Sequence, residues 1–233
     1  MTIIQVEYLS KTFGLLPALR GLDFSVERGE SVLLFGANGS GKSTLLRLLS
    51  GLSKPTAGSI RIGGWELPRE AMAVRAQIGL VAHRPLLYEN LTATENLDFF
   101  GKLYGIKADE REARGDELLR QAGLDRRAHT LVRTFSRGMK QRLSIARALL
   151  HQPDILLLDE PYSGLDQAAC ELLDELLAGA KHAGRTVILS THQVARAPKT
   201  AERALVLSGG KIAFDGPCDR GRLAELNRDA PKA

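Results

Sequence analysis

Cysteine is scarce in this sequence, which has two among 233 residues, Cys170 and Cys218. They are far apart, form no C-x-x-C pair and have no neighbours at metal-ligand spacing. A zinc site or a disulfide framework is normally marked by several cysteines at short, regular spacings. The pattern therefore favours two reduced thiols in a cytoplasmic protein.

Long apolar runs are also missing. No stretch approaches the ~18–20 consecutive apolar residues that a membrane-spanning helix requires. The N-terminal residues 1–5 include no charged segment followed by an apolar one, so no secretory signal is expected. A role at a membrane would then have to come through a partner.

Clustered positive charge is a third absence. The formal net charge is +5, but basic and acidic residues alternate, and Arg126-Arg127 is the only adjacent basic pair. No stripe of lysine and arginine is interleaved with aromatic residues, so no nucleic-acid partner is expected. The basic excess is interpreted as a solvated surface, with mild attraction to an anionic membrane face as the alternative.

The strongest pattern that is present is G-x-x-x-x-G-K-[ST], the phosphate-binding P-loop. It follows the apolar run 32–35, typical of a buried strand, and precedes leucines at helical spacing. Glycines let the backbone N–H groups point inward at a polyphosphate, a lysine supplies a cation for the outer phosphates, and the next hydroxyl suits Mg²⁺. An ordinary glycine turn is the alternative, but the strand and the Lys-Ser pair favour a nucleoside triphosphate site. The predicted phosphate-binding residues are Gly36, Ala37, Asn38, Gly39, Ser40, Gly41, Lys42, Ser43 and Thr44.

A pair of carboxylates follows a second apolar run. Residues 155–158 are typical of a buried parallel strand, which would deliver Asp159 to the edge where ligands bind in open α/β sheets. Asp159 is therefore a candidate Mg²⁺ ligand. Glu160 is the candidate for polarising a water in line with the γ-phosphate. A surface Asp-Glu pair is the alternative, which the P-loop disfavours.

A serine-capped helix is the third candidate element. Ser136 is a good N-cap for a helix that carries Leu143, Ile145 and Leu149. Because a helix N-terminus attracts anions, it is a second potential phosphate site. Two such sites on one chain suggest a protein that encloses nucleotide as a dimer.

Hydrophobic periodicity divides the chain. Residues 1–30 alternate like two antiparallel strands, and leucines at helical spacing predict a helical insert over 91–150. Strand-like runs return at 155–158 and 187–189. We expect a single domain, residues 1–233, with its core at about 1–90 and 151–220, the helical subdomain at about 91–150 and a short tail at 221–233.

In the order and spacing of these motifs, nearly the whole chain resembles the ATP-binding subunit of ATP-binding cassette (ABC) transporters. Gly36–Thr44 looks like the Walker A loop, Ile155–Asp159 the Walker B strand and Glu160 the catalytic glutamate. Residues 136–139 stand at the signature motif and residues 163–166 at the D-loop.

The resemblance also implies individual roles. It makes Glu160, His192 (the switch histidine) and Lys42 catalytic. Phe13, which the residues alone leave open as a core filler or a base-stacking aromatic, matches the A-loop aromatic. Ser136 and Gly138 would bind nucleotide across the dimer, and Asp166, in the D-loop, is also implied to bind nucleotide. The implied metal ligands are Ser43, His83 and Asp159.

Two departures from the family pattern narrow the resemblance. Arg137 and Met139 replace the usual glycine and glutamine of the signature, a form similar to the ATPases of ABC-2-type exporters. His83 stands where the family has the Q-loop glutamine, and an imidazole there can accept a hydrogen bond or coordinate a metal as the glutamine does. With the segment that follows it, His83 resembles the ATP-binding subunit of the haem exporter used in cytochrome c maturation.

The resemblance implies a P-loop NTPase of the ABC type, with an α/β RecA-like core, an antiparallel β subdomain and a helical insert. It implies ATP and Mg²⁺ as cofactors and a homodimer of ATPase subunits on ATP binding. Transmembrane permease subunits would dock near Arg84–Asn96, with the chain peripheral at the cytoplasmic face of the inner membrane. Haem export is the first expectation for the cargo, and an ABC-2-type exporter of lipid, polysaccharide or drug is the alternative. A soluble ABC-type ATPase acting on nucleic acid or the ribosome, and a binding-only regulatory cassette, are more distant alternatives.

Overall fold

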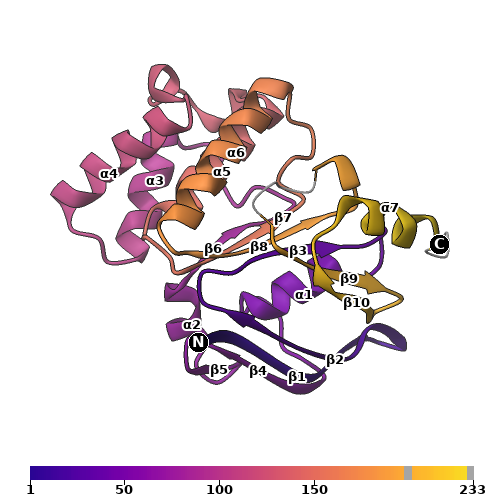
Figure 1. Ribbon diagram of the computed structural model, residues 1–233. Helices are drawn as coiled ribbons and strands as arrows, with labels where there is room; N and C mark the ends of the chain where they lie inside the picture. Colours follow the sequence, from indigo (N-terminus) through magenta and orange to yellow (C-terminus); the bar gives the residue numbers. More distant parts are fainter. Residues whose placement is uncertain (197–200, 230–233) are drawn as a thin grey trace.

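A computed structural model describes residues 1–196 and 201–229 (Figure 1). The strands are β1 (Thr2–Phe13), β2 (Leu16–Glu27), β3 (Ser31–Phe35), β4 (Ala57–Ile62), β5 (Trp65–Leu67), β6 (Ile78–Val81), β7 (Ile155–Asp159), β8 (Thr186–Thr191), β9 (Arg203–Ser208) and β10 (Lys211–Pro217). The α-helices are α1 (Lys42–Leu49), α2 (Ala71–Ala76), α3 (Ala93–Leu103), α4 (Ala108–Gln121), α5 (Arg137–Leu149), α6 (Gln167–His182) and α7 (Arg220–Asp229).

The strands form two sheets. The six-stranded sheet has the order β10-β9-β3-β8-β7-β6, in which β10 pairs antiparallel with β9 and the other pairs are parallel. The four-stranded sheet, in the order β2-β1-β4-β5, is antiparallel. Figure 1 shows α1 between the two sheets and α3 to α6 on the other side of the six-stranded sheet.

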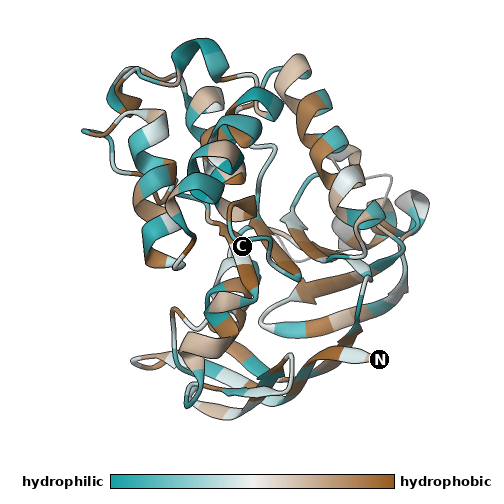
Figure 2. Ribbon diagram, turned by 90° about the vertical axis from the view of Figure 1, so that its left-hand side faces the viewer, coloured by the Kyte–Doolittle hydropathy of each residue, from teal (hydrophilic) through white to brown (hydrophobic). Residues whose placement is uncertain are grey.

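Strand β3 shows why the central strands read as continuous apolar runs. Val32 and Leu34 join the hydrophobic cluster that includes α1 and the four-stranded sheet, whereas Leu33 and Phe35 join the cluster that includes α3 to α6. A parallel strand with both faces covered has no polar face, so the period-2 signal disappears. Figure 2 shows hydrophobic residues concentrated along these central strands.

The predicted α/β architecture, with its antiparallel β portion and its helices after residue 91, is confirmed. The helical stretch contains α3, α4 and α5, with 3₁₀ turns at Asp125–Arg127 and Val132–Thr134. Helix α3 starts at a capping box, in which the Thr92 hydroxyl accepts from the Glu95 N–H and the Glu95 carboxylate accepts from the Thr92 N–H. None of the described helices is long and apolar enough to cross a membrane.

Two short elements, β5 and α2, were not predicted. Each has a single buried residue, Leu67 and Val74 respectively, so neither shows a hydrophobic period. The predicted tail begins within α7, and its last residues, 230–233, lie outside the described part of the chain. The subdomain boundaries at about residues 90 and 150 stay a prediction.

Candidate nucleotide-binding site

The glycine-rich loop joins β3 to α1 at the C-terminal edge of the parallel sheet. Gly36 and Gly41 have φ values of 152° and 109°, in the region that favours glycine. A Cβ at Gly36 would clash with the Leu207 carbonyl, and one at Gly41 would clash with the Ala18 carbonyl. The loop backbone therefore passes too close to its neighbours for any other residue at these two positions.

Lys42 starts α1 and is only 6% exposed. Its ammonium donates to the Gly36 carbonyl at 2.7 Å and the Ala37 carbonyl at 3.1 Å, and lies 3.7 Å from a carboxylate oxygen of Glu160. Burial lowers the pKa of Lys42, and the negative charges of Glu160 and Asp159 oppose that shift. The loop thus encloses a cation at the place where the pattern predicts phosphate.

Asp159 and Glu160 are held by a neighbouring strand. The register between β7 and β8 sets Asp159 opposite Ser190, whose hydroxyl donates to Asp159 Oδ1 at 2.7 Å. The Glu160 N–H donates to the Ser190 carbonyl and to the Ser190 Oγ, at 3.2 and 3.0 Å. Glu160 has φ 50°, an unfavourable value for a glutamate, and these bonds hold it in this conformation.

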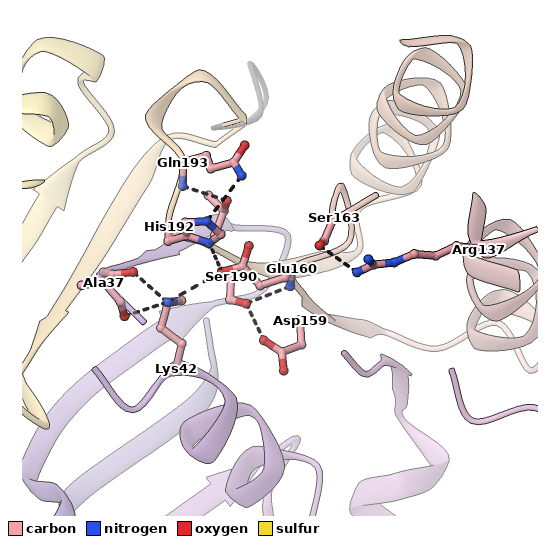
Figure 3. Close-up of polar contacts among 11 residues, drawn as sticks. Ala37, Lys42, Arg137, Asp159, Glu160, Ser163, Ser190, His192 and Gln193 are labelled. Atoms are coloured by element: carbon pink, nitrogen blue, oxygen red, sulfur yellow. Dashed lines mark hydrogen bonds and ion pairs between the residues drawn. The ribbon is translucent and has the colours of Figure 1, made fainter. Parts of the chain in front are cut away.

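His192 completes the polar cluster in Figure 3. Its Nδ1 lies 2.9 Å from Glu160 Oε1, the oxygen that Lys42 also approaches. The Nε2 lies 3.4 Å from the amide nitrogen of Gln193. With a proton on Nδ1, His192 donates to Glu160 and orients its carboxylate, so that Glu160 stands between an imidazole and an ammonium.

Lys42 and Glu160 line a cavity of about 280 Å³. It is lined by Ala18, Asn38, Gly39, Gly41, Lys42, Ser43, Thr44, His83 and Glu160. The cavity thus brings together most of the predicted P-loop residues with Glu160 and His83, which come from different elements. Beside it, the Ser40 hydroxyl is buried with no hydrogen-bond partner in the described part of the chain.

The donor set for a metal fits Mg²⁺. Ser43, His83 and Asp159 line an adjoining cavity of about 420 Å³. A hydroxyl and a carboxylate are the hard oxygen ligands that Mg²⁺ prefers, and this ion usually keeps water and phosphate oxygens as its other ligands. Among the described residues no group of three or more His, Cys, Asp or Glu could hold a metal ion.

Nine predicted residues are not among those lining the nucleotide cavity. Five of them belong to the loop or the polar cluster described above: Gly36, Ala37, Ser40, Asp159 and His192. The other four come from elsewhere in the fold. Ser136 is the N-cap of α5, where its hydroxyl accepts from the Met139 N–H, and Gly138 lies in the first turn. Asp166 caps α6 in the same way, through the Ala169 N–H. Phe13, at the end of β1, is 55% exposed, with the Lys11 ammonium 4.9 Å from its ring centre. All four are exposed or partly exposed, and in the described part of the chain none of them lies at the nucleotide cavity.

Three features were missed. Ser190 bonds to the Asp159 carboxylate and to the Glu160 backbone N–H, and only its place directly after the apolar run 187–189 could have drawn attention to it. Ala18 lines the cavity from β2, a small residue with no sequence signal. Arg137 donates to the Ser163 hydroxyl at 3.0 Å, so the arginine that replaces a signature glycine joins α5 to the loop after Glu160.

A glycine loop between a parallel strand and a helix, with a carboxylate at the end of another strand of the same sheet, defines a P-loop nucleoside triphosphatase. The family model for "ABC transporter" matches residues 19–163. The chain belongs to the ABC transporter family of ATP-binding proteins. It is an ATP-hydrolysing enzyme that uses ATP and Mg²⁺, the ATPase subunit of an ABC transporter.

Curated relatives cover most of the chain. It is 36% identical over 210 residues to the linearmycin resistance ATP-binding protein LnrL of Bacillus subtilis, covering 90% of this chain and 68% of the relative. It is 40% identical over 221 residues to the daunorubicin resistance ATP-binding protein DrrA3 of Streptomyces coeruleorubidus, covering 94% and 69%. With the Nod factor export ATP-binding protein I of Ralstonia nicotianae it shares 38% identity over 214 residues, covering 92% and 67%.

Solved structures agree on the fold. An ATP-binding subunit of an ABC transporter superposes with a TM-score of 0.87 at 36% identity, covering 98% of this chain and 95% of that one. A dimeric ATP-binding cassette in a post-hydrolysis state with ADP and Pi gives a TM-score of 0.85 at 30% identity, covering 92% and 98%. None of the relatives named here is described as a haem exporter, so the narrower resemblance at His83 gains no support from them.

Proposed function

We propose that this chain powers an ABC-2-type exporter whose cargo is a lipid, a polysaccharide or a drug. The observation that carries the proposal is the signature segment, in which Arg137 and Met139 replace the usual glycine and glutamine. Relatives named for resistance to linearmycin and daunorubicin, and for Nod factor export, support this class over haem export. We therefore favour an ABC-2-type exporter over haem export, which was the first expectation.

In the proposed site, Lys42 and the P-loop N–H groups bind the outer phosphates of ATP. Lys42 exchanges the Gly36 and Ala37 carbonyls for phosphate oxygens, which a buried cation would favour. Ser43 and Asp159 hold Mg²⁺, which neutralises negative charge on the phosphates when bound. Ser190 fixes the Asp159 carboxylate by hydrogen-bonding one of its oxygens, so that the other stays available.

Glu160 is proposed to position the attacking water and accept its proton. His192 holds one carboxylate oxygen, and Lys42 lies near the same oxygen, which leaves the second for water. His83, at the boundary of the 280 and 420 Å³ cavities, can contact water beside the metal. Lys42 and the loop N–H groups then stabilise the charge that develops on the transferred phosphoryl group.

Ser136, Gly138 and Asp166 are proposed to act on the nucleotide of a second chain. In this chain they are available for that role, because their side-chain or backbone contacts are local helix caps. A relative cassette solved as a dimer supports the assembly. Phe13 is proposed to stack on the base, since its ring is exposed at the end of β1.

The remaining proposal concerns the membrane. The chain is proposed to sit at the cytoplasmic face of the inner membrane, where permease subunits dock near Arg84–Asn96. Recovery of the permease with the tagged chain from detergent-solubilised membranes would identify the transporter class. An ABC-2-type permease is the expected result. Recovery of a haem exporter permease would instead support haem as the cargo.

The catalytic role is tested by Glu160→Gln. Turnover should fall by about 10²–10⁴-fold, because the amide cannot accept a proton, while ATP binding persists. ATP should also shift the variant to a dimer in size-exclusion chromatography, since the closed state is no longer released by hydrolysis. Glu112→Gln, at an exposed carboxylate on α4, is the matched control and should keep full activity. Unchanged hydrolysis in Glu160→Gln would contradict the assigned role.

A further inference from the structure

A groove beside the nucleotide site is formed by two cavities of about 420 and 120 Å³. Leu52, Leu80 and Leu86 line both, so the two spaces adjoin along an apolar strip. The residues that line the smaller cavity come from α2, β6 and α5 and from the segments that follow α1, β6 and α3. These elements lie on the left-hand half of Figure 1, the side turned toward the viewer in Figure 2. Leu52 and Leu86 are 49% and 41% exposed, which leaves apolar surface available to a partner.

Arginines dominate the charge of this groove. Arg47 and Arg84 line the larger cavity, and Arg75 and Arg147 line the smaller one. Among residues 1–196 and 201–229 none of these four forms an ion pair. The one carboxylate that lines either cavity is Asp159, in the larger cavity with Ser43 at the proposed metal site. The smaller cavity therefore has two guanidinium groups and no anion.

Arg147 is the residue that most needs an anion. It is 8% exposed, its Nη2 donates to the Leu80 carbonyl, and its guanidinium lies 4.9 Å from the centre of the Phe100 ring. Its Nε is buried and has no hydrogen-bond partner in the described part of the chain. Burial lowers the pKa of Arg147, because removing the guanidinium from water disfavours its charged form. A buried charge is normally paired, so this guanidinium is incomplete in the isolated chain.

The neighbouring ionisable groups cannot supply the anion. Tyr104, which lines the same cavity, stacks on His151 with ring centres 3.7 Å apart, and burial raises its pKa, so it stays neutral. The His151 Nε2–H donates to the Ile78 carbonyl at 3.2 Å, and burial lowers the pKa of His151 to about 4. It is neutral at physiological pH and never negative. The missing charge must come from outside the described part of the chain.

We propose that the segment of the membrane partner that enters this groove carries an aspartate or glutamate, whose carboxylate pairs with Arg75 and Arg147 while its apolar neighbours cover the leucine strip. The inference rests on the proposed function, because it assumes a membrane partner. It adds the chemistry of that partner's docking segment, an acidic residue among apolar ones. It also places the acid at the end of the groove away from Asp159, where like charges do not meet.

Site-specific crosslinking tests the proposal in the intact complex. The full chain, with the photoreactive residue p-benzoylphenylalanine in place of Leu86, is expressed in its own cells and irradiated in isolated membranes. Mass spectrometry then identifies the crosslinked segment. We expect a cytoplasmic segment of a membrane protein with an Asp or Glu within about one helical turn of the crosslink.

Charge reversal provides the second readout. Arg75→Glu should reduce recovery of the crosslinked partner with the tagged chain at least about tenfold, and changing the partner's acid to lysine should restore it. Arg75 is exposed, so the variant should fold, and its basal ATPase activity should be unchanged. Arg61→Glu, at an exposed arginine on β4 without an ion pair among the described residues, is the matched control and should not reduce recovery.

The outcomes separate this proposal from the one on which it rests. A crosslink to a membrane protein segment without an acid, or Arg75→Glu with normal recovery, would overturn the charge pairing and leave the transporter role standing. A crosslink to lipid or to a soluble protein, or none at all, would overturn the docking segment as well. Failure of the purified unmodified chain to associate with any membrane protein would count against the proposed function itself.

Discussion

The two ends of the proposed nucleotide site differ in how complete they are within one chain. At the edge of the six-stranded sheet, Lys42 and Asp159 are 6% and 5% exposed and are joined to neighbouring elements by hydrogen bonds. At the start of α5, Ser136 is exposed and its hydroxyl bonds only to its own helix. The first region, called the complete region below, is assembled by the register of the sheet. The second, called the open region, presents a capped helix end to solvent. The difference supports the proposal that the first region binds nucleotide alone and the second acts with another chain.

Among the variants that test this difference, Lys42→Ala should have the largest effect on activity, because it removes the cation of the complete region. ATP hydrolysis should fall by about 10²–10³-fold, the usual cost of one lost charge-stabilising donor. Steady-state release of phosphate measures this. The control is Lys211→Ala, at an exposed lysine on β10, which should change nothing. Equal activity in the two variants would remove the distinction between the regions.

Gly41→Ala and Gly138→Ala compare the two regions through a single methyl group. At Gly41 the methyl clashes with the Ala18 carbonyl at a φ of 109°, so the free energy of unfolding should fall by about 1–3 kcal/mol. At Gly138 the nearest side-chain atom is 3.7 Å away, and a helical alanine should leave stability unchanged or raise it by up to about 1 kcal/mol. Urea unfolding measures both. If Gly138→Ala lost more stability than Gly41→Ala, the packing described here would be wrong.

Ser190→Ala tests the anchor of the complete region. Loss of its bonds to Asp159 and Glu160 should lower the free energy of unfolding by about 1 kcal/mol and ATPase activity several-fold, since the Asp159 carboxylate and the Glu160 backbone each lose a hydrogen bond that fixes them. Ser144→Ala is the control, a buried serine whose hydroxyl has no partner among the described residues, and it should be neutral or stabilising. An active, stable Ser190→Ala would show that the carboxylates need no anchor.

Arg137→Ala should have the smallest effect on stability. Its bond to Ser163 is exposed, so the free energy of unfolding should change by no more than about 0.5 kcal/mol. ATPase activity should change more than stability does, because Arg137 lies beside the helix end that is proposed to face the second nucleotide. Parallel unfolding and activity measurements decide this, and a change in stability with unaltered activity would make Arg137 a structural residue only.

The site could be predicted from sequence where a local pattern carries it. Glycines before Lys42, apolar residues before Asp159 and a serine before α5 each encode a turn, a strand end or a cap within a few residues. Ser190 could not be predicted, because its role comes from the register between β7 and β8, two strands that are distant in sequence. The short β5 and α2 were missed since a single buried residue leaves no period.

Complementation between two inactive chains tests the central claim most directly. Lys42→Ala disables the complete region and Ser136→Asn blocks the open one while keeping a helix-capping side chain. In a dimer with one copy of each, one nucleotide site has both faults and the other has neither. The account predicts that the mixture hydrolyses ATP well above the sum of the separate variants. Activity no greater than that sum, with mixed dimers shown to form, would contradict it.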